Sequence, residues 1–91
     1  MMTEQQKQHM AASLDAAYPR LVAQFANDPS HSRLWPGAAK VAVAAKVAVE
    51  QGRMTRIAAS LEISQAWLAD HQAWREANPA TAKAMARSAA E

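Results

Sequence analysis

The chain has 91 residues, no cysteine and a formal net charge of +2. A chain of this length forms one domain with a small core, and without cysteine it can form neither a disulfide nor a thiolate zinc site. No apolar run approaches the ~20 residues that a membrane-spanning helix needs, and the polar start MMTEQQKQHM is unlike a secretory signal. We therefore expect a cytoplasmic protein, whose small positive charge permits nucleic acid binding without requiring it.

The first expected element is a helix near the N-terminus, in an all-α fold that the abundant alanine and only two glycines favour. Thr3 and Gln6 form a capping-box pattern that begins this helix. Pro19 interrupts it, because proline lacks an N–H group and restricts the residue before it. One kinked helix within 1–27 and two shorter helices both remain open, and we prefer the kinked helix. Apolar residues follow along it at spacings of three and four: Met10, Leu14, Ala17, Tyr18, Leu21 and Phe25.

The second expected helix lies between a loop at 27–36 (NDPSHSRLWP) and Gly52. Pro36 suits its first turn and Gly52 lies just past its end. Its four valines all have odd numbers, as in a strand, but the alanine content and the length favour a helix. Because this helix is apolar nearly all round, we expect it to be buried in the centre of the domain. Its polar edge consists of Lys40, Lys46 and Glu50.

The segment from Gly52 to Pro79 is interpreted as a helix-turn-helix. A short helix over 54–61 and a second helix over 64–77 are joined by a tight turn, and Ser64 caps the second helix. Asn78 before Pro79 ends that helix, and an alanine-rich helix over 79–91 follows. The expected fold is therefore a small single-domain bundle of four or five helices, with a helix-turn-helix core over 36–77. The apolar contacts between the paired helices come from Ile57, Leu61, Ile63 and Leu68.

The distribution of charge and polar residues indicates how such a unit could contact DNA. The segment 36–61 contains four basic residues and one acidic residue, Glu50, whereas 62–78 contains three acidic residues and one arginine. On a reading helix in the major groove, Gln65 is expected to hydrogen-bond adenine and Asp70 to accept a hydrogen bond from cytosine N4. The expected phosphate contacts are Lys40, Lys46, Arg53, Thr55 and Arg56. The outward-facing residues of the reading helix are Ser64, Gln65, Ala66, Ala69 and Asp70.

The motif IAASLEIS at 57–64, followed by ANP at 77–79 and AKAMARS at 82–88, resembles a known family over residues 35–87. The family is the homeodomain-like helix-turn-helix of phage small terminase subunits and transposase-type DNA-binding proteins. The resemblance implies DNA recognition by the second helix and oligomer formation by the flanking helices. Two positions depart from the pattern: Glu62 stands where the turn usually has glycine, and His71 stands where an apolar anchor is usual.

Two groups of apolar residues are candidates for an oligomer or partner interface. The first is the seam of Met10, Leu14, Leu21 and Phe25, which serves either as the packing face of the first helix or in dimerisation. The second is Trp67 and Trp74, which share one helical face with His71 and serve either in the core or as an aromatic anchor for a partner. Core packing is the interpretation that we prefer for both.

No pattern in the sequence indicates catalysis. The three histidines are far apart and lack carboxylates at metal-ligand spacing, and there is no glycine-rich phosphate loop. We therefore expect no enzyme activity, no metal and no cofactor. The first hypothesis is a phage-type or mobile-element-type protein that binds double-stranded DNA as a homo-oligomer. The alternative is a small helical phage-encoded protein that binds and inhibits a host protein complex, and a purely structural subunit is a third possibility.

Overall fold

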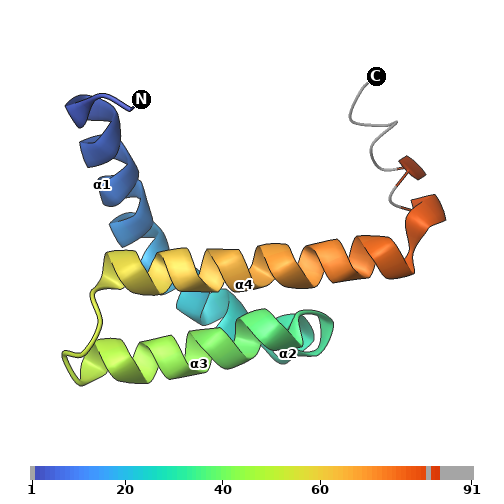
Figure 1. Cartoon of the computed structure of the whole chain (residues 1–91). Coiled ribbons are helices and arrows are strands. Elements are labelled where there is room, and N and C mark those ends of the chain that lie inside the picture. Colours follow the sequence, from blue (N-terminus) through green and yellow to red (C-terminus); the bar gives the residue numbers. More distant parts are fainter. Residues whose placement is uncertain (1, 82, 85–91) are drawn as a thin grey trace.

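A computed structural model describes residues 2–81, 83 and 84, and the regular elements in this part of the chain are all helical. They are α1 (Glu4–Leu21), the π-helix η1 (Val22–Ala26), α2 (Pro29–Leu34), α3 (Pro36–Glu50) and α4 (Arg56–Ala77). Helices α3 and α4 lie side by side and antiparallel, η1 packs against α3, and α1 crosses α4 near its start (Figure 1). The predicted all-α bundle is confirmed. The expected C-terminal helix over 79–91 lies mostly outside the described residues.

The N-terminal helix begins at the predicted cap and changes its winding after Pro19. The Gln6 N–H donates to the Thr3 side-chain oxygen at 3.1 Å, and the Thr3 N–H donates to the Gln6 side chain at 2.9 Å. Pro19 lies inside α1, and the chain continues without a break into η1. The continuous helix that we preferred is therefore observed, with a π-helical last part. Val22 and Phe25, the buried residues of η1, belong to the core.

The segment at 27–36, which we expected to be a loop, contains a helix. This short helix, α2, begins because the Asp28 carboxylate accepts the Ser30 N–H at 2.9 Å, with Pro29 at the first helical position. The Ser32 hydroxyl donates to the Phe25 carbonyl at 3.3 Å. This hydrogen bond joins α2 to the end of η1. The chain therefore reverses between η1 and α3 in a compact, internally bonded connection.

The core is small because alanines form the contact face of α3. The buried residues of the main core cluster are Val22, Phe25, Ala38, Ala42, Ala45, Ala59 and Ile63. Small side chains on facing helices allow close packing, but they bury little apolar area per residue. The expectation that α3 is buried nearly all round is wrong, since Val43 and Val47 are 51% and 41% exposed. Ala38, Ala42, Ala45 and Ala48 face inward, and these two valines face outward.

Helix α4 runs without interruption from Arg56 to Ala77. The predicted turn at 61–64 is therefore wrong, and so is the predicted cap at Ser64, which lies in the middle of a helix. The actual cap is Thr55, whose side chain accepts the Ala58 N–H at 3.1 Å. A helix-turn-helix of this family requires a residue with a glycine-like backbone in the turn. The sequence has Glu62 there, and among the described residues only Gly52, at the end of α3, has a positive φ.

Candidate interaction surfaces

The residues expected to bind DNA do not form one surface, and several of them have structural roles. The Arg56 guanidinium lies 3.3 Å from the Asp15 carboxylate and donates to the Asp15 carbonyl oxygen at 3.1 Å. It also lies over the Tyr18 ring, at 5.4 Å from the centroid. Thr55 is the cap of α4, so its hydroxyl already accepts a backbone N–H. Arg56 and Thr55 therefore connect and begin helices in this structure.

Asp70, which we expected to reach a cytosine, instead caps another helix. Its Oδ2 accepts the Ala38 N–H at 2.9 Å, at the start of α3. Helix α3 follows Trp35, which provides no side-chain cap of its own. The carboxylate lies so close to Gly37 that a Cβ there would be 2.5 Å from Oδ1. This contact holds the middle of α4 against the beginning of α3.

The remaining members of the expected reading helix are spread around α4. Ala66 packs against the core, Ser64 is half-buried, and Gln65 and Ala69 are exposed. On α3, Lys46 is half-buried, whereas Lys40 is exposed, as is Arg53 in the following connection. Of the ten residues expected to bind DNA, the exposed cations Lys40 and Arg53 line one depression beside α3, and Gln65 and Ala69 share an exposed side of α4.

The apolar residues expected at an oligomer or partner interface belong mostly to the inside of the domain. Phe25 is 3% exposed and lies in the core cluster, and Leu21 packs against that cluster. Leu14 is half-buried where α1 crosses α4, and its carbonyl accepts the buried Ser60 hydroxyl at 2.6 Å. Met10 is 49% exposed, on the part of α1 that projects from the bundle (Figure 1). The core interpretation therefore holds for Leu21 and Phe25.

An aromatic cluster covers the side of α4 that faces the α2–α3 connection. The Trp67 and His71 rings stack with centroids 5.0 Å apart, and Trp35 meets Trp67 edge-on at 5.9 Å. Trp74 stacks on the other side of His71 at 6.2 Å. His71, which stands where the family has an apolar anchor, is thus part of a ladder of rings. This ladder agrees with the preferred core role of Trp67, and all four rings remain half-exposed or less.

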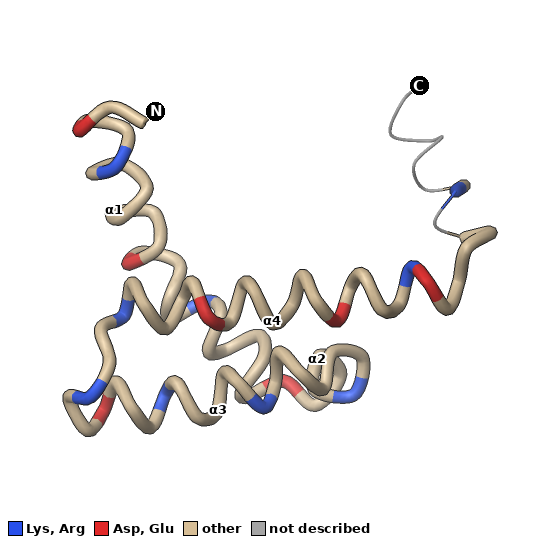
Figure 2. The backbone as a smooth tube through the Cα atoms, viewed as in Figure 1, with Lys and Arg blue, Asp and Glu red and all other residues tan. Residues whose placement is uncertain are grey.

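The outer face of α3 is the first candidate interaction surface. We define this face by Lys40, Val43, Val47 and Arg53, which line one shallow depression together with two alanines. Figure 2 shows the basic residues along α3 and at the connection to α4. We did not expect Val43 and Val47 at a surface, because a helix that is apolar nearly all round is expected to be buried. Their spacing from Lys40, of three and seven residues, is the signal that puts them on one helical face with that lysine.

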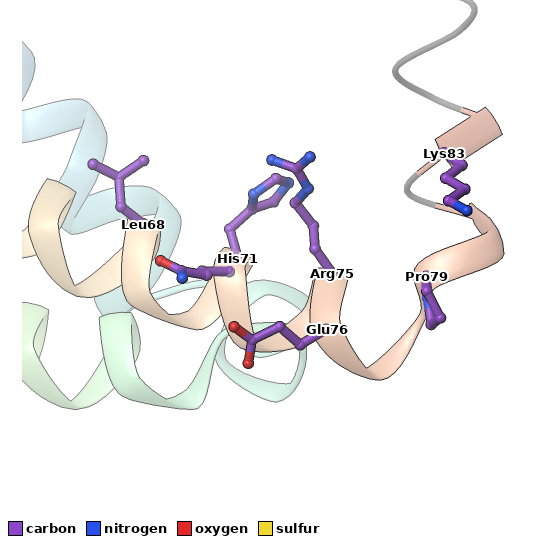
Figure 3. Close-up of a pocket in the computed structure, with 7 residues that line it drawn as sticks. Leu68, His71, Arg75, Glu76, Pro79 and Lys83 are labelled. Atoms are coloured by element: carbon purple, nitrogen blue, oxygen red, sulfur yellow. The ribbon is translucent and has the colours of Figure 1, made fainter.

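A second candidate is an apolar stripe along α4. Ile57, Leu61 and Leu68 are 38%, 46% and 58% exposed. They had been expected to hold two separate helices together, a role that disappears because α4 is continuous. Figure 3 shows Leu68 projecting from the same side of α4 as His71 and Arg75. These side chains leave a hollow beside the end of α4 that is polar at its Arg75 and Glu76 end.

Chemistry-bearing side chains are sparse in the described residues. Nowhere in 2–81, 83 and 84 do three or more potential metal ligands gather, and none of the helices there combines the length and the apolar character needed to cross a membrane. The shifted carboxyl is Asp28, whose pKa is lowered from 3.8 chiefly by its hydrogen bond with His31 and next by the Ser30 N–H. This pair belongs to the cap of α2.

Comparisons of the chain with protein-family models, curated proteins and solved structures found no match. Its function has to be inferred from the surfaces of this chain alone.

Proposed function

We propose that the chain is a non-catalytic protein-binding module. The outer face of α3 binds a segment of the partner that carries both apolar and acidic side chains. The observation that carries the proposal is the position of two exposed valines between two cations. Val43 and Val47 are 51% and 41% exposed, and Lys40 and Arg53 line the same depression. Burying two such side chains under a partner contributes favourable free energy, because apolar area leaves water.

A protein partner explains this face better than DNA does. Contacts to the phosphate backbone come from basic and polar groups, and apolar contacts to DNA are made to base edges inside a groove. On α3 the valines occupy the middle of the face and the cations lie at its edge. Moreover, the continuous α4 lacks the turn that would present a short reading helix.

The charge of the face indicates the chemistry of the partner. In the described part of the chain neither Lys40 nor Arg53 takes part in an ion pair, and the Arg53 Nε donates only to the neutral Gln51 side chain at 2.8 Å. Carboxylates on the partner would complement these cations and would favour the correct orientation of the docked segment. A helix with apolar residues at spacings of three and four and acidic residues beside them has this chemistry.

The test is site-specific photo-crosslinking in cells of the source organism. Val47 is replaced by a photo-crosslinking amino acid, and the matched control carries the same replacement at Ala73, an exposed position of α4. We expect a protein adduct at Val47 that is absent at Ala73 and is lost in a Lys40→Glu/Arg53→Glu background. Equal adducts at both positions, or an adduct that survives the charge reversal, would contradict the proposal.

Binding of labelled mixed-sequence duplex DNA, followed by fluorescence anisotropy from about 50 to 200 mM salt, tests the alternative. If the partner is a protein, we expect that the chain does not show the steeply salt-dependent DNA binding that phosphate contacts produce. Steep binding that Lys40→Glu/Arg53→Glu abolishes and Val43→Ser/Val47→Ser leaves intact would replace the protein partner with DNA.

A further inference from the structure

Helix α4 carries a self-complementary stripe of residues, which we define as Ile57, Leu61, Ser64 and Leu68. Their successive spacings of four, three and four residues are those of the a and d positions of a coiled coil. Ser64 is half-buried, and the three large apolar members are between 38% and 58% exposed. No charged residue interrupts the stripe, so its own side chains contribute only apolar groups and one hydroxyl to the contact with a second helix.

The size of the molecule leaves room for such a partner. The Cα radius of gyration is 15.2 Å, whereas a compact chain of this length has about 12 Å. The accessible surface is 6530 Å², against about 5200 Å² for a compact monomer of this mass. Figure 1 shows that the first half of α1 and the C-terminal end of α4 project from the bundle, so the molecule is elongated.

We propose that two copies of the chain pair antiparallel along this stripe. In the two-fold register, Ile57 of each copy faces Leu68 of the other, and Leu61 faces Ser64. The two outer layers then each pair two large apolar side chains, Ile57 and Leu68. The two inner layers each pair the large Leu61 with the small Ser64, so the side chains can pack. A two-fold interface uses the same patch on both copies, as this stripe requires.

The antiparallel direction follows from the residues that continue the stripe. Arg75 lies seven residues beyond Leu68 on the same side of α4 (Figure 3). In a parallel pair the Arg75 side chains of the two copies would face each other, so that like charges would repel at the end of the seam. In the antiparallel register Arg75 lies beyond the four layers of the stripe. The second copy is therefore an occupant that matches the stripe in pattern and avoids this repulsion.

The first test is the molar mass of the full chain in solution, measured by sedimentation equilibrium from about 5 to 200 µM, a range that covers micromolar dissociation constants. We expect the wild type to approach twice the chain mass of 9.8 kDa at the upper end. Leu61→Asp and Leu68→Asp should be monomeric throughout and should retain the wild-type helical circular dichroism. Ala73→Asp, on another exposed side of α4, should associate like the wild type. A wild type that stays monomeric, or a dimer that Leu68→Asp does not weaken, would overturn the proposal.

The second test reports on the direction and does not depend on the aspartate variants. Because the chain has no cysteine, Ile57→Cys and Leu68→Cys introduce single thiols. We expect oxidation of an equimolar mixture to give the mixed disulfide dimer in excess over either variant alone. Disulfide dimers that form as readily from Ile57→Cys alone would indicate a parallel pair and would refute the antiparallel register. The outer face of α3 is not involved, so a monomeric wild type that still forms the adduct at Val47 would leave the proposed function standing.

Discussion

Arg56 provides the hydrogen bond that Pro19 cannot give to Asp15. In a regular helix the N–H of residue 19 would donate to the carbonyl oxygen of residue 15, but proline has no N–H. The Arg56 Nη2 donates to that oxygen at 3.1 Å, while its Nε lies 3.3 Å from the Asp15 carboxylate. The start of α4 is thereby attached to the point where α1 is interrupted. An arginine that the sequence suggests for a phosphate contact thus holds two helices together.

Replacing Arg56 with alanine should therefore destabilise the fold, and the loss should depend on Pro19. We expect Arg56→Ala to lower the free energy of unfolding by about 1 kcal/mol, because the hydrogen bond and the half-exposed ion pair are both of modest strength. In a Pro19→Ala background the helix can supply its own N–H to Asp15, so the same substitution should cost less. Urea unfolding of the four variants measures this coupling. Arg53→Ala is the matched control and should have little effect, and strict additivity would show that the carbonyl contact contributes nothing.

The contact between Asp70 and Ala38 should behave as a helix cap made across the tertiary structure. We expect Asp70→Ala to lower the free energy of unfolding by about 0.5–2 kcal/mol, the range of N-cap deletions. Asp70→Asn keeps an oxygen acceptor and should lose less. Thermal unfolding followed by circular dichroism compares the two variants. If Asp70 served only in an external contact, Asp70→Ala would be neutral and indistinguishable from Glu76→Ala, an exposed acid on the same helix.

The continuity of α4 can be tested at Glu62, where the helix-turn-helix family has glycine. In a continuous helix, Glu62→Gly should destabilise the protein by about 0.5–1 kcal/mol, since glycine is a poor helix former. In a tight turn with a left-handed residue at this position, the same substitution would relieve strain and stabilise the protein. Urea unfolding gives the sign, and Glu62→Ala serves as the control that should be neutral or slightly stabilising. A Glu62→Gly variant that is more stable than the wild type would contradict the continuous helix and would support a turn at 61–64.

The cap of α2 should weaken in acid. The folded-state pKa of Asp28 is lowered from 3.8 by its hydrogen bonds with His31 and the Ser30 N–H. A lowered carboxyl pKa contributes stability that is present above the unfolded-state value and is lost as the pH falls through the folded-state value. We therefore expect the α2 amide resonances to shift toward their unfolded positions below pH 3.8. Asp28→Asn retains an acceptor without a titrating group, and its α2 resonances should not respond over that range. An Asp28 carboxyl that titrates at or above 3.8 would contradict this account.

Local sequence signals determined much of this protein's secondary structure. The Thr3 capping box, the start of α3 at Pro36, its end before Gly52 and the stop at Asn78 could all be read from the chain, because each depends on residues within one turn of the helix end. The same holds for the all-α class, which follows from alanine content and helix propensity. Glu62 is also a local signal, since a residue other than glycine disfavours the tight turn at this position.

Only the tertiary structure decided which side of each helix is buried and what its polar residues do. Alanines and valines alternate on α3 in a way that leaves its inner face ambiguous, and packing against Ala59 and Ile63 selects the alanines. Arg56 and Asp70 acquire their partners from segments 41 and 32 residues away. The pattern of residues within one helix cannot predict contacts between residues so far apart in the sequence. The exposed valines of α3 and the apolar stripe of α4 became visible for the same reason, since a surface is defined only after the core has been chosen.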